Sequence, residues 1–407
     1  KTRENHKKAV KRLVFEELFV LRAGLLYLKG MSLKKAGCVI KRGYLEDFKS
    51  LLPFKITSAQ ERVIKECMRD MFSGFPMNRL VQGDVGSGKT VIAAALIYAT
   101  SKNGYQSAMM APTEILAVQH YKTLLKITEN TGIRCALLTG KLKKKESEKI
   151  KTALKNGEID VVVGTHSLIS SDVEFSKLGL VITDEQHRFG VNQRGNLSLK
   201  GENPHTLVMS ATPIPGTLGL ILYGDLDISI VDEYPAGRQK INTYLVDTSY
   251  RERIYRYIKK FLDQGRQAYI VCPLVEDGEE VNITSATEYY ENIKDGEFKD
   301  YSVGLLHGKM NARQKEEVME KFSSGEIQLL VATTVIEVGI DVPNAVLMVI
   351  ENAERFGLSQ LHQLRGRVGR GEYRSDCILI TDNKTEETLK RLEIIKNSND
   401  GFEIADK

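Results

Sequence analysis

Three short stretches of the sequence combine residue types that could act on phosphate groups. The first, GDVGSGKT at Gly83–Thr90, fits the pattern G-x-x-x-x-G-K-[ST]. Its glycines let the backbone wrap an anion with inward N–H groups, and the helix that follows adds the positive end of its dipole. Lys89 can reach the β- and γ-phosphates of a nucleotide, and the Thr90 hydroxyl can ligate Mg²⁺. The predicted nucleotide-binding loop consists of Gly83, Asp84, Gly86, Ser87, Gly88, Lys89 and Thr90.

Two acidic residues end an apolar run in the second stretch, GLVITDEQH at Gly179–His187. In a parallel sheet the carboxyl ends of the strands line the ligand crevice, so these acids would face a bound nucleotide. Asp184 can hold Mg²⁺ through a water, and Glu185 can orient or deprotonate the attacking water. Solvated acids in a turn are the alternative, but a phosphate loop in the same predicted sheet favours the catalytic interpretation.

The third stretch, QLRGRVGR at Gln363–Arg370, places three arginines among glycines. Arginine offers a fixed cationic fork for phosphate oxygens. The stretch lies in the second half of the chain, so its arginines reach a nucleotide only if two domains close on each other. Hydrolysis would then depend on closure, because these arginines complete the transition-state clamp. A basic surface loop is the alternative.

Small hydroxyl residues follow four predicted strands. They occur in APTE from Ala111, GTH from Gly164, SAT from Ser210 and ATT from Ala332. Hydroxyls and exposed backbone N–H groups can grip a sugar-phosphate backbone without reading bases. Each of these motifs alone is an ordinary turn or cap, but four of them at strand ends predict a groove for nucleic acid.

The elements that must position these residues follow a β-α-β rhythm, which is typical of parallel sheets covered by helices on both faces. The first series of predicted strands comprises Arg79–Gln82, Ser107–Ala111, Cys135–Leu138, Val161–Val163, Leu180–Thr183 and Thr206–Ser210, with helices such as Glu114–Glu129 and Lys143–Asn156 between them. The second series, which has no phosphate loop, comprises Gln267–Pro273, Ser302–His307, Gln328–Thr333, Val346–Glu351 and Asp376–Thr381. Pro and Gly in Asp232–Lys240 indicate a linker between the two series. Apolar residues spaced by three and four between Val10 and Leu28 predict a long amphipathic helix that packs or, alternatively, binds a partner.

The composition is that of a soluble globular chain with room for two or three domains. Of its 407 residues, 42% are hydrophobic and 27% are charged, and the net charge of +5 permits a nucleic-acid partner without requiring one. The longest uninterrupted apolar run, Val91–Ala99, is too short for a membrane span, and the N-terminus does not have the pattern of a signal peptide. The five cysteines form no C-x-x-C pair, which favours free thiols in a reducing compartment over zinc ligands or disulfides.

Taken together, the motifs resemble those of superfamily 2 helicases, and their amino-acid sequences are similar to those of the bacterial RecG family of branched-DNA helicases. The stretches that carry the resemblance are VQGDVGSGKT, MAPTEILAVQH, DEQHRFGVNQR, SATPIPGTL, VATTVIEVGIDVPNA and QLHQLRGRVGRG. The resemblance implies an α/β fold with two RecA-like parallel-sheet domains in tandem after an N-terminal helical segment. The expected parts are a helical connecting segment at 1–45, helicase domain 1 at 46–235, helicase domain 2 at 236–384 and the start of a translocation region at 385–407.

The resemblance also implies roles for individual residues. The implied catalytic residues are Asp184, Glu185, Arg367 and Arg370, the two arginines acting as arginine fingers. The implied nucleotide ligands beyond the phosphate loop are Gln60, at the adenine, and Asp341. The implied Mg²⁺ ligands are Thr90 and Asp184, and the implied DNA contacts are Thr113, Thr165, Thr333 and Thr334. The residues implied to couple hydrolysis to DNA are His187, Ser210 and Thr212.

The function implied by the family is that of an ATP- and Mg²⁺-dependent motor that acts on stalled replication forks and Holliday junctions. Its expected partners are branched, duplex and single-stranded DNA and a single-strand binding protein, with no membrane. The chain is expected to be a monomer in the bacterial cytoplasm, near the nucleoid. The motor of the transcription-repair coupling factor is the nearest alternative, against which APTEILAVQH and the Gln of DEQH argue. A regulatory ATP-binding module that does not hydrolyse ATP is the other alternative, against which Glu185 and Arg370 argue.

The sequence departs from the family pattern in three places. The N-terminal wedge domain, an OB-fold, does not precede the helical segment, so we expect a motor core without it. Gly216 stands where the family usually has Arg after TPIP. The chain ends at Asn397–Lys407, before the helical hairpin that couples hydrolysis to translocation along duplex DNA, so the translocation region is expected to be truncated.

Overall fold

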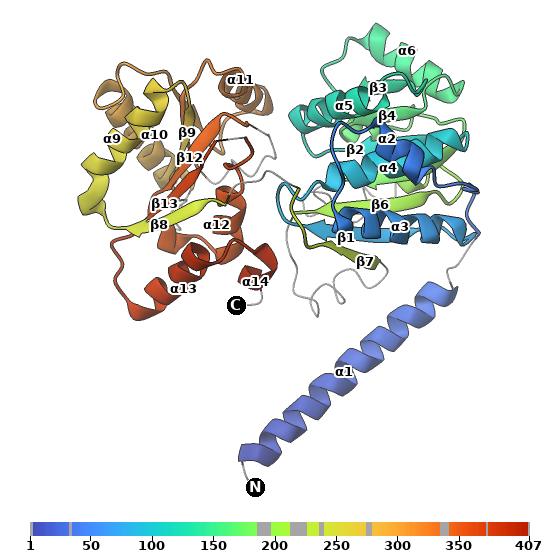
Figure 1. The fold of residues 1–407 in the computed structure, drawn as a ribbon, viewed down its shortest axis with the longest axis horizontal. Coiled ribbons are helices and arrows are strands. Elements are labelled where there is room, and N and C mark those ends of the chain that lie inside the picture. The colour runs from blue at the N-terminus through green and yellow to red at the C-terminus, as the bar shows by residue number, and fades with distance from the viewer. Residues whose placement is uncertain are drawn as a thin grey trace. The chain divides into compact units, whose positions relative to one another are not determined.

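The computed structural model describes most of the chain, which divides into two compact units. The described residues are 3–31, 35–184, 197–211, 226–235, 240–273, 279–333, 342–371 and 373–405. The first unit comprises Lys1–Gly83 and Gly88–Glu233, and the second comprises Asp84–Ser87 and Tyr234–Lys407. Each unit is built on its own parallel sheet (Figure 1). The predicted functional positions outside the described residues are Glu185, His187, Thr212, Gly216, Thr334 and Asp341.

The first unit contains a seven-stranded sheet. Its strands are β1 (Asn78–Gly83), β2 (Gln106–Met110), β3 (Cys135–Leu138), β4 (Val161–Gly164), β5 (Leu178–Thr183), β6 (His205–Ser210) and β7 (Asp227–Val231). They lie in the order β3-β4-β2-β5-β6-β1-β7, and every neighbouring pair is parallel. The predicted parallel α/β fold is therefore confirmed. The sequence analysis missed β7, an edge strand in which only Ser229 and Val231 are buried, so its apolar signal is weak.

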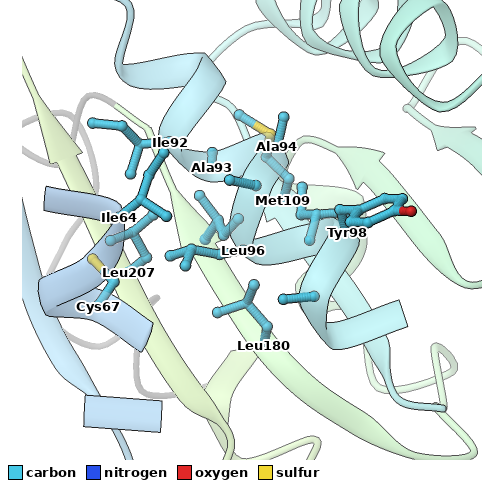
Figure 2. Packing of buried hydrophobic residues seen from close by; sticks show 14 of the residues in the cluster. Ile64, Cys67, Ile92, Ala93, Ala94, Leu96, Tyr98, Met109, Leu180 and Leu207 are labelled. Carbon is cyan, nitrogen blue, oxygen red and sulfur yellow. The ribbon is translucent and has the colours of Figure 1, made fainter. Parts of the chain in front are cut away.

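Helices cover both faces of this sheet. They are α2 (Leu45–Leu51), α3 (Ser58–Phe72), α4 (Lys89–Lys102), α5 (Glu114–Thr128) and α6 (Lys144–Lys155). Alternate strand residues enter separate cores: Leu180 of β5 packs in the core that contains α3 and α4, and Val181 packs in the other. Every residue of α4 from Ile92 to Thr100 is buried, as expected of a helix that is apolar all round. Figure 2 shows Ile92 and Leu96 of this helix among Ile64 of α3 and Leu207 of β6.

The predicted N-terminal helix is present as α1 (Arg3–Met31), a single helix of 29 residues. The apolar side chains that the structure describes on this helix are exposed; for Leu13, Phe15 and Phe19 the exposed fractions are 61%, 65% and 61%. The packing expected of this helix is thus not seen against any part of the chain that the structure describes. Among the described helices, none has the length and apolar content that crossing a membrane requires.

The second unit contains a six-stranded sheet with the order β10-β11-β9-β12-β13-β8, again with parallel neighbours only. Its strands are β8 (Asn242–Val246), β9 (Gln267–Val271), β10 (Val303–Leu306), β11 (Leu329–Ala332), β12 (Ala345–Ile350) and β13 (Asp376–Ile380). Its helices are α9 (Arg251–Asp263), α10 (Glu279–Asp295), α11 (Ala312–Ser323), α12 (Leu358–Arg365), α13 (Glu386–Asn397) and α14 (Gly401–Ala405). The edge strand β8 directly follows the predicted linker and was not predicted.

One buried histidine makes the stability of the first unit depend on pH. His205 is fully buried, and its Nδ1 accepts a hydrogen bond from the Met77 N–H at 2.9 Å. Its Nε2 has no partner among the described residues, so the ring is held neutral in an environment that penalises charge. Burial lowers the pKa of His205 from 6.5 to about 4.

We expect the free energy of unfolding to fall as the pH is lowered from 6.5 to about 4, because the unfolded chain binds the proton first. The stability contributed by neutral His205 is complete above pH 6.5, and the loss reaches about 3 kcal/mol near pH 4. His205→Asn keeps an acceptor for Met77 but cannot titrate. Urea unfolding of both proteins across this range measures the effect, and equal pH slopes would contradict the assignment.

Candidate nucleotide and nucleic-acid site

The carboxyl ends of all seven strands of the first sheet lie along one edge, because the strands are parallel. The order β5-β6-β1 places the strand that ends before Asp184 two positions from the strand that leads into the phosphate loop. Two strand spacings separate their axes by about 10 Å. On the other side of β5 lie β2 and β4, which end next to the APTE and GTH motifs, and then β3; the SAT motif ends β6, on the side of the phosphate loop. Asp184 therefore lies between the half of the edge that carries the phosphate loop and the half that carries the APTE and GTH motifs.

The phosphate loop has the backbone that anion binding requires. Gly86 and Gly88 have φ angles of 79° and 83°, in the left-handed region that favours glycine. The Lys89 Nζ donates to the Gly83 carbonyl oxygen at 2.7 Å, which holds the ammonium over the loop. Asp84 and Ser87 are buried at 5% and 1% exposure, and Thr90 lies in the first turn of α4. This loop backbone, the Lys89 ammonium and the Thr90 hydroxyl form a set of groups that fits a Mg²⁺-nucleotide.

Asp184 is held by a histidine that the sequence analysis did not assign a role. The His120 Nε2 lies 2.7 Å from the Asp184 Oδ2, and the two residues are 5% and 9% exposed. Asp184 also donates its backbone N–H to the Met110 carbonyl oxygen at 3.0 Å, which fixes the start of the turn to β2. His120 closes the quoted motif MAPTEILAVQH, but its distance of 64 residues from Asp184 hid the contact. One ring thus joins helix α5 to the predicted metal-linked acid.

Gln60 is placed by a capping box at the start of α3. Its side-chain oxygen accepts from the Thr57 N–H at 2.9 Å, and the Thr57 hydroxyl accepts from the Gln60 N–H at 3.1 Å. Gln60 is 2% exposed. The cap therefore fixes the carboxamide, and the predicted adenine contact would use a side chain whose oxygen already has a partner.

The hydroxyl residues predicted to contact DNA lie in three different environments. The Thr113 hydroxyl caps α5 by accepting from the Leu116 N–H at 3.3 Å. Thr165 follows β4, and its hydroxyl lies 3.2 Å from the Ser167 hydroxyl oxygen. Thr333 follows β11 in the second unit and is 0% exposed, and its hydroxyl has no hydrogen-bond partner among the described residues.

Ser210, the first residue of the SAT motif, ends the strand between β5 and β1. It is the register partner of Gln82, which precedes the phosphate loop. Ser210 is 4% exposed. A residue here borders both the phosphate loop and the strand that leads to Asp184, which suits a residue expected to couple the two.

The arginine stretch lies at the end of α12 in the second unit, and its three arginines have different surroundings. Arg365 is 2% exposed and donates from Nη1 to the Ser398 carbonyl oxygen at 2.8 Å, at the end of α13. A cation at a helix C-terminus is favourable, so Arg365 braces α12 against α13. Arg367 is 5% exposed, and Arg370 is half-buried with its Nε donating to the Gly366 carbonyl oxygen at 3.0 Å.

Two family models match the chain, one for each sheet. The DEAD/DEAH box helicase model matches residues 57–219, and the helicase conserved C-terminal domain model matches residues 251–372. With two parallel α/β sheets and a phosphate loop after β1, these matches place the chain in the DEAD/DEAH-box helicase class.

Curated relatives narrow this class to one family. The ATP-dependent DNA helicase RecG of Bacillus subtilis is 48% identical over 414 residues, which cover 100% of this chain and 60% of the relative. The RecG of Thermotoga maritima is 49% identical over 408 residues, covering 100% and 52%. A solved structure of RecG bound to a three-way DNA junction superposes with a TM-score of 0.87 at 47% identity, covering 100% of this chain and 54% of that one. The chain belongs to the RecG family, and it spans between 52% and 60% of the length of these two curated relatives.

Proposed function

We propose that this chain is the ATP-hydrolysing motor of a RecG-type DNA helicase and that DNA controls its hydrolysis. The observation that carries the proposal is the 2.7 Å contact between His120 and Asp184. It joins α5, whose N-terminal cap is a predicted DNA contact, to the acid that is predicted to hold Mg²⁺. A module that only binds ATP needs no such link between the two halves of the sheet edge.

In the proposed reaction the loop N–H groups and Lys89 bind the phosphates of ATP. Thr90 and Asp184 would hold Mg²⁺, which when bound would neutralise charge that develops on the phosphoryl oxygens. Glu185 orients the attacking water and accepts its proton. The carboxamide of Gln60, already fixed by its cap, positions the adenine, and Asp341 contributes a further contact to the nucleotide.

The arginine stretch has a separate part in the proposed reaction. Arg367 and Arg370 supply positive charge to the transition state, whereas Arg365 is a structural residue in this proposal because its guanidinium is committed to the end of α13. In this proposal His187, Ser210 and Thr212 couple ATP hydrolysis to the residues that contact DNA.

The proposed substrate is branched DNA, which the solved relative binds as a three-way junction. In this proposal the DNA backbone is gripped by Thr113 and Thr165 in the first unit and by Thr333 and Thr334 in the second. Since Thr333 is fully buried, its contact requires the chain around it to open. Such a substrate places the chain in the bacterial cytoplasm, at the nucleoid.

Backbone recognition makes a specific prediction for DNA binding. We expect the affinity for a three-way junction to fall steeply with salt, because phosphate neutralisation releases counterions, and to be indifferent to base sequence. Fluorescence anisotropy with two junctions of equal geometry and different sequence measures both properties. A strong preference for one of the two sequences would contradict the proposed grip.

His120 provides a second prediction. His120→Ala is expected to lower the DNA-stimulated kcat by about tenfold to a hundredfold, as is usual when a residue that orients a metal ligand is removed. The apparent Kd values for ATP and for DNA should change little, because His120 contacts neither in the proposed arrangement. His120→Gln, which can donate to the same carboxylate, should recover part of the loss.

Thr128→Ala is the matched control for this prediction. Thr128 is buried on the same helix, and its hydroxyl donates to the Leu124 carbonyl oxygen at 2.8 Å without contacting Asp184. Equal kcat losses in the His120 and Thr128 variants would show that α5 packing, and not the contact with Asp184, is what His120 provides.

A further inference from the structure

The second unit carries a groove at one end of its sheet, where the helical layer stops. Helix α9 packs over β9 and β12, and on the edge strand β8 Tyr244 is exposed and Val246 is half-buried. The groove has a volume of about 630 Å³. Tyr244 and Val246 of β8 and Ile378 of β13 form its floor, and one side of α9 forms its wall. Tyr244 and Ile378 are register partners, so they lie side by side on the same face.

Three cations line the wall of this groove. Arg253, Arg256 and Lys260 are spaced by three and four residues, so they share one stripe of α9 that is about 10 Å long. All three are exposed, and no acidic partner for them lies among the described residues. Neighbouring cations of the same helix are paired: Arg251 with Glu351 at 2.7 Å and Lys259 with Glu297 at 2.6 Å.

Aromatic rings alternate with these charges. Tyr244 and Tyr250 are 42% and 46% exposed. The third ring, Tyr257, is fixed because its hydroxyl donates to the Asp376 Oδ2 at 2.6 Å. Asp376 is 2% exposed and also accepts from the Asn242 side chain at 2.8 Å, so its carboxylate is satisfied within the fold. The groove therefore presents tyrosine faces beside uncompensated positive charge.

We propose that this groove binds single-stranded nucleic acid. The stripe of Arg253, Arg256 and Lys260 is long enough to face roughly two or three consecutive phosphates, and Tyr244 and Tyr250 offer faces on which bases stack. A volume of about 630 Å³ admits a few nucleotides of one strand but not a duplex. An acidic peptide would satisfy the cations but would leave the two exposed tyrosine faces without a flat partner.

This groove is separate from the hydroxyl motif of the second unit. Thr333 follows β11, and three strands, β9, β12 and β13, lie between β11 and β8. Four strand spacings put the two strands roughly 19 Å apart. The groove would thus hold a different strand from the one that the predicted DNA-contact threonines grip, for example a strand displaced from a duplex.

The test is fluorescence anisotropy of a short labelled oligothymidylate with the whole chain in the absence of nucleotide. Arg253→Ala/Arg256→Ala/Lys260→Ala is expected to weaken binding and to reduce the slope of log affinity against log salt by about 2. Tyr244→Ala is expected to weaken binding about fivefold to a hundredfold, and Tyr244→Leu should not restore it, because a leucine fills space but does not stack. Lys259→Ala, which removes a paired cation from the same helix, should leave the affinity unchanged.

A second readout distinguishes stacking from a change in the fold. The chain has 16 Tyr and no Trp, so tyrosine emission can be followed directly, and oligothymidylate should quench less of it in Tyr244→Leu. Basal ATP hydrolysis should be unchanged in every groove variant, so failure here would leave the proposed motor function standing. The proposal is overturned if the triple variant binds oligothymidylate like the wild type, or if it loses only the binding of polyglutamate, which would identify a peptide site.

Discussion

Lys89→Ala is expected to lower the affinity for ATP by at least about two orders of magnitude and to remove hydrolysis with it. Truncating one member of a desolvated charge pair costs about 2 to 5 kcal/mol, because the other charge is left without its partner. In this structure the Lys89 ammonium already lies over the loop, 2.7 Å from the Gly83 carbonyl oxygen. Calorimetric titration with a non-hydrolysable ATP analogue measures the loss.

Lys102→Ala is the matched control for Lys89→Ala. Lys102 is the last residue of the same helix α4, is exposed, and donates to the Thr131 carbonyl oxygen at 3.0 Å. It should bind the analogue like the wild type. If the Lys89 variant also bound the analogue with wild-type affinity, the nucleotide would have to be held elsewhere, and the proposed phosphate site would be wrong.

Glu185→Gln is expected to separate binding from turnover. Loss of a general base costs about a hundredfold to ten-thousandfold in rate, whereas the neutral amide keeps the size of the side chain. The variant should bind the ATP analogue as tightly as the wild type but release phosphate at least about a hundred times more slowly. Steady-state phosphate release and analogue titration on the same preparation measure the two properties.

Glu129→Gln, at the exposed C-terminal end of α5, changes the same charge away from the proposed site and serves as the control. Turnover at the wild-type rate in Glu185→Gln would contradict the assignment of Glu185 as the general base. Turnover and binding lost together would show instead that Glu185 acts on the ground state, as a ligand of the Mg²⁺-nucleotide.

The sequence predicted the strands that can be recognised from the residue types of adjacent positions alone. Eleven of the thirteen described strands, including the edge strands β3 and β10, were expected within one or two residues of their observed ends, because parallel strands that are largely buried read as apolar runs. The two strands that were missed, β7 and β8, lie at sheet edges, where side chains such as Asp227 and Tyr244 are exposed and break the run. The packing expected for α1 could not be judged from its own periodicity, since an apolar stripe does not say what covers it.

The parts of the site that the sequence did not predict depend on contacts between distant residues. The pattern of the phosphate loop is complete within eight residues and could be read directly. The contact of His120 with Asp184 spans 64 residues and depends on β2 and β5 being neighbours. Likewise, the sequence alone does not distinguish Arg365 from the other two arginines of its stretch. Only the position of α13 in the structure shows that the Arg365 guanidinium donates to the end of that helix.

The central claim is that ATP hydrolysis by this chain is controlled by DNA. Steady-state phosphate release, measured with Mg²⁺ and saturating ATP before and after addition of a three-way junction, tests it most directly. The account predicts a low rate without DNA and at least about a tenfold rise with the junction, because DNA acts through the same Asp184 that serves the nucleotide. It predicts no rise in Lys89→Ala, because that variant has lost ATP binding. A wild-type rate that is the same with and without the junction would contradict it.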